Sequence, residues 1–331
     1  MKLSIITINY NNAEGLRKTL ASVAAQTYAD IEHIIVDGGS TDNSVEVIRD
    51  YSQSPIANSH EIRWISEKDK GIYNAMNKGI KIALGKRIVN DDHTSSPNSL
   101  IASSPYRLSD YIQILNSGDI LAADDVTERM FEAMGNRQLV INKENSAAET
   151  IASNLSPLTS NLQSRISILY GNMIKDYPDG RRTKDTCGGG DYTPESFLYF
   201  YKGTLNHDCA YIRRDLFEKY GLYNEQMKIC SDWEWYVRAI VLGGERTVYT
   251  NIDVTVFDMT GISESDGKNH ALIQQERRAY LESILPAAVL RDYDNYSFPI
   301  SQYQRLKKYH LWGIVHFMER VLFKLEKWFK K

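Results

Sequence analysis

The chain of 331 residues contains only three cysteines, Cys187, Cys209 and Cys230, and no two of them form a C-x-x-C pair. This scarcity argues against a zinc site and against a framework of disulfides, and it favours a reducing compartment such as the cytosol. An excess of basic residues is also missing, since the formal net charge is -3. No overall positive field therefore points to a nucleic acid partner.

Long apolar segments are absent as well. No window approaches the roughly 18 to 20 uninterrupted apolar residues that a membrane-spanning helix needs. An apolar strand pattern begins directly after Lys2, without the apolar run and cleavage site of a secretory signal, so we expect no such signal. The chain does contain 42% hydrophobic residues and 21 tyrosines, which is typical of a folded globular protein.

The first 85 residues repeat one pattern three times: a short apolar segment, a polar turn, and a segment with helical spacing of its apolar residues. Strands are predicted at 3–8, 31–36 and 62–66, and helices at 15–26, 43–51 and 71–84. This alternation predicts an α/β fold with a parallel sheet, right-handed crossovers and helices on both faces. Further on, a helix is predicted at 123–134 and short strands at 167–170 and 208–212.

The stretch 111–119, Tyr-Ile-Gln-Ile-Leu-Asn-Ser-Gly-Asp, begins as a buried strand and ends in a turn that presents the carboxylate of Asp119. Ligands of open α/β sheets bind beyond the carboxyl ends of the strands. A carboxylate there can hold a hard cation, and the cation can hold a diphosphate. Taken alone, the stretch is described equally well as a strand followed by an ordinary polar turn.

Three more polar segments follow predicted strands, at 9–11, 37–40 and 69–74. Tyr10 offers an aromatic face for a base, and Asp37 can accept a hydrogen bond from a base N–H. The helix start after Gly71 offers N–H groups that suit a polar ligand. Each segment alone is common turn chemistry, but four of them at one edge of a sheet predict a nucleotide site.

Five segments carry a known pattern in order: SIITINYNN at 4–12, VDGGSTD at 36–42, SEKDKGIYNAMNKG at 66–79, LNSGD at 115–119 and CSDWE at 230–234. Together they resemble the family 2 glycosyltransferases, over roughly residues 2–262, and the third segment is the most specific. Within that family the chain is similar to the bacterial branch that builds cell-surface polysaccharides. The resemblance implies a GT-A fold, an open and mostly parallel sheet flanked by helices.

The resemblance also implies which residues bind the donor. Nucleotide-sugar contacts are expected from Ile8, Tyr10, Asn11, Asp37, Gly38, Ser40, Asp69, Gly71, Ile72, Asn77, Asn116, Ser117 and Gly118. Asp119 fills the last position of the family's D-x-D-like motif, so it is expected to bind Mg²⁺ or Mn²⁺ together with the donor diphosphate. Asn116 and Gly118 replace more acidic residues, which leaves one strong metal ligand. Asn74 also departs from the family, where Asp is more frequent.

An alternative metal motif, Asn90-Asp91-Asp92, lies in the segment 86–110. Relatives connect directly across this point, so we interpret the segment as an insertion. Asp119 is preferred because a longer strand precedes it and its sequence context matches the family.

Asp232 is the expected catalytic residue, since an acidic residue at this helix start acts as general base in the family. It would take the proton of the acceptor hydroxyl while that oxygen attacks the anomeric carbon, a single displacement that inverts the configuration. Without the resemblance, a carboxylate in the first turn of a helix is explained as well by the helix dipole. Glu234 is the rival base, and His207, Trp233 and Glu234 are candidate contacts to acceptor or diphosphate. A lone histidine is more often structural than functional, so a structural role for His207 is the alternative.

The C-terminal segment differs in charge from the rest of the chain. Residues 301–331 hold eight basic and two acidic residues, a net charge of +6, so residues 1–300 carry -9. Apolar residues recur at helical spacing from 311 to 329, and a basic, amphipathic, Trp-containing helix fits a membrane interface. Packing on the body or in a dimer is the alternative.

We therefore divide the chain into a GT-A domain at 1–265 and a helical extension at 266–331. Within the domain, the nucleotide half is expected at about 1–122 and the acceptor half at about 123–265. The expected function is inverting transfer of a hexosyl or N-acetylhexosaminyl group from a nucleotide-sugar, UDP-linked by preference, to a glycan or lipid-linked glycan. The alternatives are a sugar nucleotidyltransferase and a non-catalytic nucleotide-binding relative. The expected location is the cytoplasm, peripheral to the inner face of the cell membrane. No pattern indicates the sugar, the acceptor or the oligomeric state.

Overall fold

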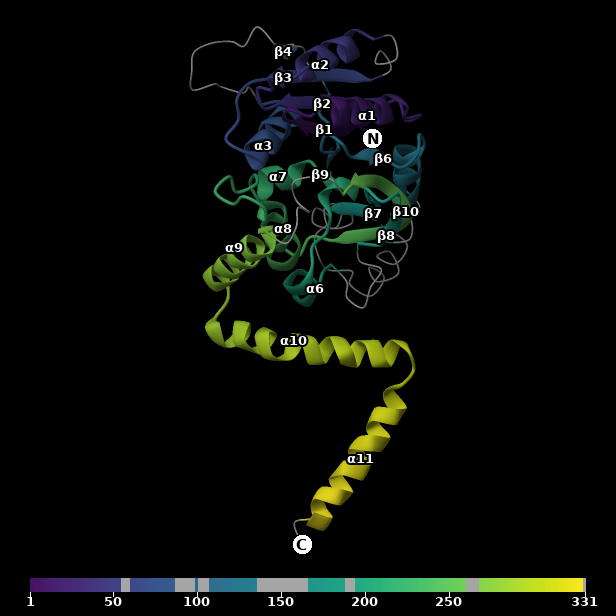
Figure 1. The fold of residues 1–331 in the computed structure, drawn as a ribbon, viewed down its shortest axis with the longest axis vertical. Helices are drawn as coiled ribbons and strands as arrows, with labels where there is room; N and C mark the ends of the chain where they lie inside the picture. Colours follow the sequence, from purple (N-terminus) through teal and green to yellow (C-terminus); the bar gives the residue numbers. More distant parts are fainter. Residues whose placement is uncertain are drawn as a thin grey trace, which may run out of the picture.

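The structure is a computed structural model of the chain, and it describes residues 1–54, 60–86, 99–100, 107–135, 166–187, 194–259 and 268–329. The described strands form one sheet with helices against it, and two long C-terminal helices reach away from this body (Figure 1). Most of the insertion predicted at 86–110, with its alternative metal motif at 90–92, lies outside the described residues.

The strands of the described part are β1 (Leu3–Asn9), β2 (Ile31–Asp37), β3 (Glu61–Ser66), β4 (Ser99–Leu100), β5 (Tyr111–Ile114), β6 (Ile120–Leu121), β7 (Ile168–Asp176), β8 (Arg182–Asp185), β9 (Ala210–Arg213) and β10 (Thr247–Asp258). The helices are α1 (Ala13–Ala24), α2 (Ser44–Gln53), α3 (Ile72–Ala83), α6 (Phe197–Lys202), α7 (Asp215–Lys219), α8 (Ser231–Tyr236), α9 (Lys268–Ile284), α10 (Ala287–Lys308) and α11 (Trp312–Phe329). A 3₁₀ turn, η2 (His207–Cys209), precedes β9, and a π-helical turn, η3 (Val237–Leu242), continues α8. Residues 126–135 are also helical, close to the predicted range.

The sheet runs in the order β4-β3-β2-β1-β5-β9-β7-β10-β6, and β8 pairs with β7. β3, β2, β1 and β5 are parallel to one another, as predicted. β9 is antiparallel to both of its neighbours, so the second half of the sheet is mixed. Two predictions need correction here. β7 does not end at residue 170 but continues to Asp176, because β10 pairs along its length. The strand predicted at 208–212 begins only at Ala210, because residues 208 and 209 belong to a 3₁₀ turn.

Helices cover both faces of the parallel half. α1 and α2 pack on one face through a small apolar cluster that includes Leu16, Leu20, Ile35, Val47, Ile48 and Trp64. α3 packs on the opposite face, where Met76, Ile80 and Ile82 join the main core. Gly79 permits the close approach of α3 to β1, because a Cβ atom there would lie only 2.3 Å from Cγ2 of Ile6. The start of α3 is thereby fixed at the carboxyl edge of the sheet.

The strand register brings polar side chains together at this edge. Asn9 is paired with Asp37, and Asp37 with Ser66, so the last residues of three strands stand in one row. Ile6 is paired with Ile114, which places the turn after β5 just beyond β1. The carboxyl ends of β1, β2, β3 and β5 therefore converge, as parallel pairing requires.

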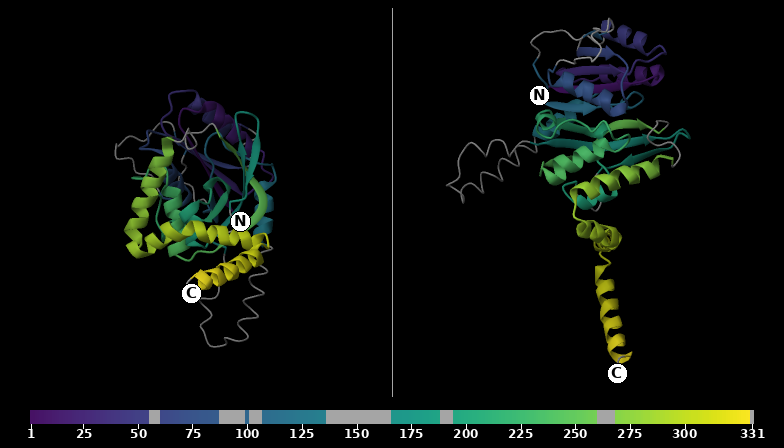
Figure 2. Two further views of the ribbon diagram at one scale, coloured as in Figure 1. Left: turned by 60° about the horizontal axis from the view of Figure 1, so that its bottom comes forward. Right: turned by 90° about the vertical axis from the view of Figure 1, so that its left-hand side faces the viewer.

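The C-terminal helices are the most exposed part of the chain. α9 lies along the body beside α8 and α10 crosses beneath the body (Figure 1), while α11 points away from it, as the right-hand view of Figure 2 shows. On α11, side chains such as Ile314 and Phe317 are 59% and 62% exposed. Within the described residues, no helix combines the length and apolar character needed to cross a bilayer.

Candidate functional site

Asp37 lies at the centre of the row of strand ends and is completely buried. Its Oδ1 accepts hydrogen bonds from the Asn9 amide at 2.8 Å and the Ser40 hydroxyl at 2.5 Å. Its Oδ2 accepts from the Ser40 backbone N–H at 3.0 Å and the Ser66 hydroxyl at 2.7 Å. In this structure Asp37 holds the loop after β2 in shape, and its oxygens do not face an open surface as the sequence interpretation assumed.

The loops after β1 and β2 are joined to each other. The Asn11 backbone N–H donates to the Ser40 hydroxyl at 2.8 Å, and the Asn11 side-chain oxygen accepts from the Thr41 N–H at 2.8 Å. Asn11 takes a left-handed backbone conformation with φ of 49°. Tyr10, the residue before it, is 64% exposed. Ile8, in contrast, is a core residue with 8% exposure. An exposed tyrosine ring over a rigid loop is suited to stacking against a base.

Three of the predicted nucleotide residues meet at Gly38. A Cβ atom at this position would lie 2.3 Å from Oδ2 of Asp69 and 3.3 Å from the ring of Tyr10. Glycine is therefore required for the carboxylate of Asp69 to approach the Tyr10 loop. Burial raises the pKa of Asp69, and the nearby charge of Asp37 adds to this while the Gly71 N–H opposes it.

The start of α3 differs from the sequence interpretation. The Gly71 N–H donates to Asp69 at 3.0 Å, and the Lys70 N–H donates to the Asn74 side chain at 3.2 Å, so these two groups already have partners. Gly71 has φ of 124°, which few other residues adopt, and Ile72 is 46% exposed. The turn therefore presents the Asp69 carboxylate to a ligand, and the N–H groups of Lys70 and Gly71 are taken, whereas no side chain of the described residues caps the first N–H groups of α3.

Asn77 also lies elsewhere than predicted. It is 2% exposed and exchanges hydrogen bonds with the Tyr223 backbone, donating to its carbonyl at 2.9 Å and accepting from its N–H at 3.0 Å. Its amide and that of Asn74 both donate to the carboxylate of Glu225, at 2.9 and 2.8 Å. The Asn74 amide therefore binds Glu225, whereas an Asp at position 74 would place a second carboxylate beside Glu225 and repel it. Asn77 connects α3 to the segment before α8.

The turn 116–119 is held from α1. The Thr19 hydroxyl donates to the Asp119 carbonyl at 2.7 Å and accepts from the Gly118 N–H at 3.0 Å, and Gly118 has φ of 109°. The Ser117 N–H donates to the carbonyl of Ile8 at 3.0 Å. These bonds fix the turn directly beyond β1.

Asp119 is 4% exposed, and its Oδ1 accepts from the backbone N–H of Asp258, at the end of β10, at 3.0 Å. Burial raises the pKa of Asp119 well above its usual range, and the charges of Asp208 and Asp258 raise it further, while His207 opposes them. The carboxylates of Asp119, Asp208 and Asp258 outnumber the one positive charge beside them, that of His207, and a hard cation would neutralise the excess.

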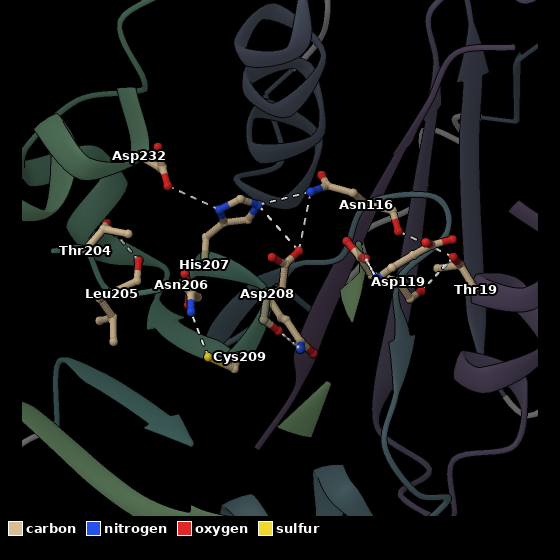
Figure 3. A network of polar contacts seen from close by, with 12 residues as sticks. Thr19, Asn116, Asp119, Thr204, Leu205, Asn206, His207, Asp208, Cys209 and Asp232 are labelled. Carbon is tan, nitrogen blue, oxygen red and sulfur yellow. Dashed lines mark hydrogen bonds and ion pairs between the residues drawn. The ribbon is translucent and has the colours of Figure 1, made fainter. Parts of the chain in front are cut away.

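His207 links this turn to α8 (Figure 3). Its Nδ1 lies 3.4 Å from Oδ2 of Asp232, and its Nε2 lies 3.5 Å from Oδ1 of Asp208 and 3.2 Å from the amide nitrogen of Asn116. Burial alone would lower the pKa of His207, but Asp208, Asp232 and Asp119 outweigh it and raise the pKa to about 9. At neutral pH the ring is therefore an imidazolium that donates to Asp232 through Nδ1 and forms an ion pair with Asp208 on the Nε2 side.

Asp232 stands in the first turn of α8, with its side chain 14% exposed. The Tyr73 hydroxyl lies 2.9 Å from its Oδ1, and His207 contacts its Oδ2. Although burial opposes ionisation, His207 and Tyr73 lower the pKa of Asp232 below its usual value. The structure thus holds an ionised, partly exposed carboxylate in one orientation.

Trp233 and Glu234 were predicted as candidate contacts to acceptor or diphosphate. In the structure both side chains are buried and bind other groups of the protein. The Trp233 ring is 1% exposed, and its N–H donates to the Phe200 carbonyl at 2.8 Å. Glu234 is 5% exposed, and Arg238 binds both of its oxygens, at 2.9 and 3.1 Å. The Glu234 carboxylate is thus less accessible to an acceptor than that of Asp232, whose side chain is 14% exposed, so Asp232 is the better candidate base.

The donor set around Asp119 fits a hard divalent cation in chemical type, because carboxylate oxygens are the ligands that Mg²⁺ and Mn²⁺ prefer. Within the described residues, however, no three His, Cys, Asp or Glu side chains are grouped closely enough to enclose a cation. Asp119 can therefore supply protein ligation, and the remaining ligands would come from diphosphate and water.

Three residues of this site were missed at the sequence level: Thr19, Tyr73 and Asp258. Asp208 was expected near the acceptor or diphosphate together with His207, because the pair resembles a segment of the family. Tyr73 lies within the third motif, but its partner Asp232 is 159 positions away, and no local pattern pairs them.

Comparisons with known proteins find glycosyltransferases as relatives. The model of the family described as Glycosyl transferase family 2 matches residues 4–101. An uncharacterized glycosyltransferase of Nostoc sp. is 36% identical over 131 residues, which are 38% of this chain and 39% of its own length. The PGL/p-HBAD biosynthesis glycosyltransferase of Mycobacterium bovis is 22% identical over 273 residues, 82% of this chain and 81% of that protein.

Solved glycosyltransferases share the fold. S. aureus TarS 1-349 in complex with UDP-GlcNAc has a TM-score of 0.51 at 14% identity, covering 93% of this chain and 73% of that one. GalNAc-T7 with UDP, GalNAc and Mn²⁺ has a TM-score of 0.50 at 12% identity, covering 92% of this chain and 51% of that one. The predicted α/β architecture, an open sheet flanked by helices, is thereby confirmed.

Proposed function

We propose that this chain, a member of glycosyl transferase family 2, transfers a sugar from a UDP-linked donor to a hydroxyl group of a glycan or lipid-linked glycan. The observation that carries the proposal is that two clusters of polar side chains, one suited to a nucleoside and one rich in carboxylates, lie at the same edge of the sheet. Tyr10, Gly38 and Asp69 meet at the ends of β1, β2 and β3. Asp119 and Asp232 lie beyond them, connected through His207 and Asp208.

In this proposal Asp232 is the general base. The acceptor O–H gives its proton to the carboxylate, and the oxygen forms a bond to the anomeric carbon. The bond from that carbon to the nucleoside diphosphate breaks on the opposite side, so the configuration inverts. Asp232 suits this role because it is ionised and oriented, and proton transfer from a positioned hydroxyl typically contributes 10²- to 10⁴-fold in rate. His207 stays protonated and keeps Asp232 in place.

Asp119 would hold a divalent cation together with the donor diphosphate. Such a cation neutralises the charge that develops on the leaving diphosphate. Tyr10 would stack on the base, and the Asp69 carboxylate would accept from a hydroxyl or N–H group of the nucleoside. Related solved structures hold UDP-GlcNAc or UDP with Mn²⁺, which supports this choice of donor and metal.

A thermal-shift panel of UDP, GDP, CDP and dTDP, each with and without Mn²⁺, tests the donor site. Ligand that binds only the native state stabilises it by about 2.7 kcal/mol at a hundred times its dissociation constant. We expect a metal-dependent rise in Tm with UDP and a smaller one with the other bases. No rise with any nucleotide would favour the non-catalytic alternative. Release of pyrophosphate from a nucleoside triphosphate and sugar phosphate would favour a nucleotidyltransferase.

We further propose that α11 binds the inner face of an anionic membrane and so brings the enzyme to a lipid-linked acceptor. At 100° per residue, Ile314, Val315, Phe317, Met318, Val321, Leu322 and Leu325 fall on one arc of about 160°. Lys324 borders this arc and Arg320 lies farther round the helix, within a segment of net charge +6. The arc is wider than the seam of a two-stranded coiled coil, and two copies with this charge would repel.

Neighbouring residues of α11 provide a matched test. Leu322 lies in the apolar arc and Phe323 lies opposite it, yet both side chains are similarly exposed, at 59% and 58%. We expect Leu322→Asp to abolish sedimentation with phosphatidylglycerol vesicles and Phe323→Asp to weaken it only slightly. Equal loss in both variants would indicate a charge effect alone, and binding unchanged in both would refute membrane contact by this helix.

A further inference from the structure

The hydroxyl group of Tyr73 lies between two acceptors. It is 2.9 Å from Oδ1 of Asp232 and 2.5 Å from the backbone carbonyl of Ile229. A phenol has one hydrogen and can donate to only one of them at a time. Its oxygen can also accept a hydrogen bond. The group is therefore able to change direction while both partners stay in place.

Both partners are held by separate elements. Glu276 of α9 accepts from the backbone N–H groups of Lys228, Ile229 and Cys230, at 2.6, 3.1 and 3.0 Å, and so fixes the segment before α8. Tyr73 belongs to α3, which Asn77 ties to the same segment through Tyr223. The contacts of α3 and of α9 with the segment before α8 thus hold the Tyr73 hydroxyl against the Asp232 carboxylate. The Tyr73 side chain is only 5% exposed.

We infer that Tyr73 is a positioning residue that supports Asp232 in both of its protonation states; this inference rests on the proposed role of Asp232 as base. While Asp232 is a carboxylate, the Tyr73 O–H donates to Oδ1. After the acceptor proton has moved to Asp232, the carboxyl O–H donates to the Tyr73 oxygen, and the Tyr73 hydrogen turns to the Ile229 carbonyl. No proton leaves Tyr73 in either state. Burial raises the pKa of Tyr73 well above 10, which keeps it a phenol.

The same protein contains a matched control. The Tyr223 ring packs against Tyr73 with 5.7 Å between centroids, and its buried hydroxyl has no hydrogen-bond partner among the described residues. Tyr73→Phe and Tyr223→Phe therefore remove the same atom from adjacent rings. Only the first removes a hydrogen bond to Asp232.

The experiment follows the Asp232 carboxyl by ¹³C NMR titration in the full chain, with the signal assigned from Asp232→Asn. Titratable groups that face Asp232 are Tyr73 from α3, His207 and Asp208 from η2, Tyr223 and Cys230 from the segment before α8, and Tyr236 from α8. The Tyr223→Phe variant keeps all of these titratable groups except the Tyr223 phenol. We expect Tyr73→Phe to raise the Asp232 pKa by about one pH unit, the size of one hydrogen bond to a charged group. Tyr223→Phe should leave it unchanged.

Kinetics give the second readout. In Tyr73→Phe we expect kcat to fall about tenfold with the donor KM unchanged, and the acidic limb of the pH profile to move to higher pH. A role in folding alone would lower activity at every pH without moving that limb. If Tyr73→Phe does not fold, 3-fluorotyrosine at position 73, a stronger donor, should move the Asp232 pKa down instead.

The outcomes separate the inference from the proposed function. An inactive Asp232→Asn variant together with an unshifted Asp232 pKa in Tyr73→Phe would overturn the role of Tyr73 and leave the base in place. An Asp232→Asn variant as active as wild type would overturn both.

Discussion

The ion cluster around His207 predicts a specific dependence of stability on pH. His207 lies 3.4 Å from Asp232 and 3.5 Å from Asp208, and its pKa is raised from 6.5 to about 9. A raised pKa means that the native state binds the proton more tightly than the unfolded state. The stabilisation is therefore complete below pH 6.5 and is lost as the pH rises to 9.

The magnitude follows from the shift. Between the two pKa values the native state holds one more proton than the unfolded state, so the free energy of unfolding falls by about 1.4 kcal/mol per pH unit. Over this window the loss amounts to about 3 kcal/mol. The side chain is only 16% exposed, so solvent screening takes little from this value.

Urea unfolding, followed by tryptophan fluorescence at half-unit steps from pH 6 to 9.5, measures this loss. The matched variant is His207→Gln, which keeps a polar side chain and cannot titrate. We expect the variant to be less stable than wild type at pH 6.5 and the two curves to converge toward pH 9.5. A constant difference between the curves across this range would refute a charged His207.

Three further predictions concern single positions. Gly79→Ala should lower the free energy of unfolding by about 1–3 kcal/mol, because its Cβ would overlap Ile6, and chemical denaturation would detect this; an unchanged midpoint would contradict the packing of α3. Gly38→Ala should displace the Asp69 carboxylate and weaken UDP binding about tenfold in calorimetry, with little change in Tm, and unchanged affinity would separate Asp69 from the nucleotide. Asp119→Asn should raise Tm in the absence of metal, since it removes a buried uncompensated charge, and it should abolish the effect of Mn²⁺ on UDP binding. A Mn²⁺ effect that survives in this variant would place the cation elsewhere.

The parallel half of the fold was predictable because its signals are local. Each of β1, β2 and β3 is a short segment rich in isoleucine followed by a polar turn, and the order of strand, turn and helix dictates parallel pairing. The length of β7 was not predictable, since residues 172–176 become strand through pairing with β10, about 80 positions later. Long-range pairing of this kind leaves no trace in local composition.

Within the site, the sequence indicated which residues stand at the sheet edge but not which way their side chains bind. Asp37 was expected to face a ligand, yet Asn9, Ser40 and Ser66 from three different segments take both of its oxygens. Asn77 was expected beside the nucleotide, yet it binds the Tyr223 backbone. Such assignments depend on which partner arrives from elsewhere in the chain, and only the folded structure determines that.

The most direct test of the central proposal is turnover of a UDP-sugar in the presence of Mn²⁺ by wild type and by Asp232→Asn, with nucleoside diphosphate and pyrophosphate measured separately. Asn keeps the size of the side chain and can still accept from Tyr73, so binding of UDP should persist. We predict that wild type releases UDP without pyrophosphate, and that Asp232→Asn loses at least 10²-fold in rate while its UDP affinity is unchanged. Release of UDP at the wild-type rate by Asp232→Asn would contradict the account.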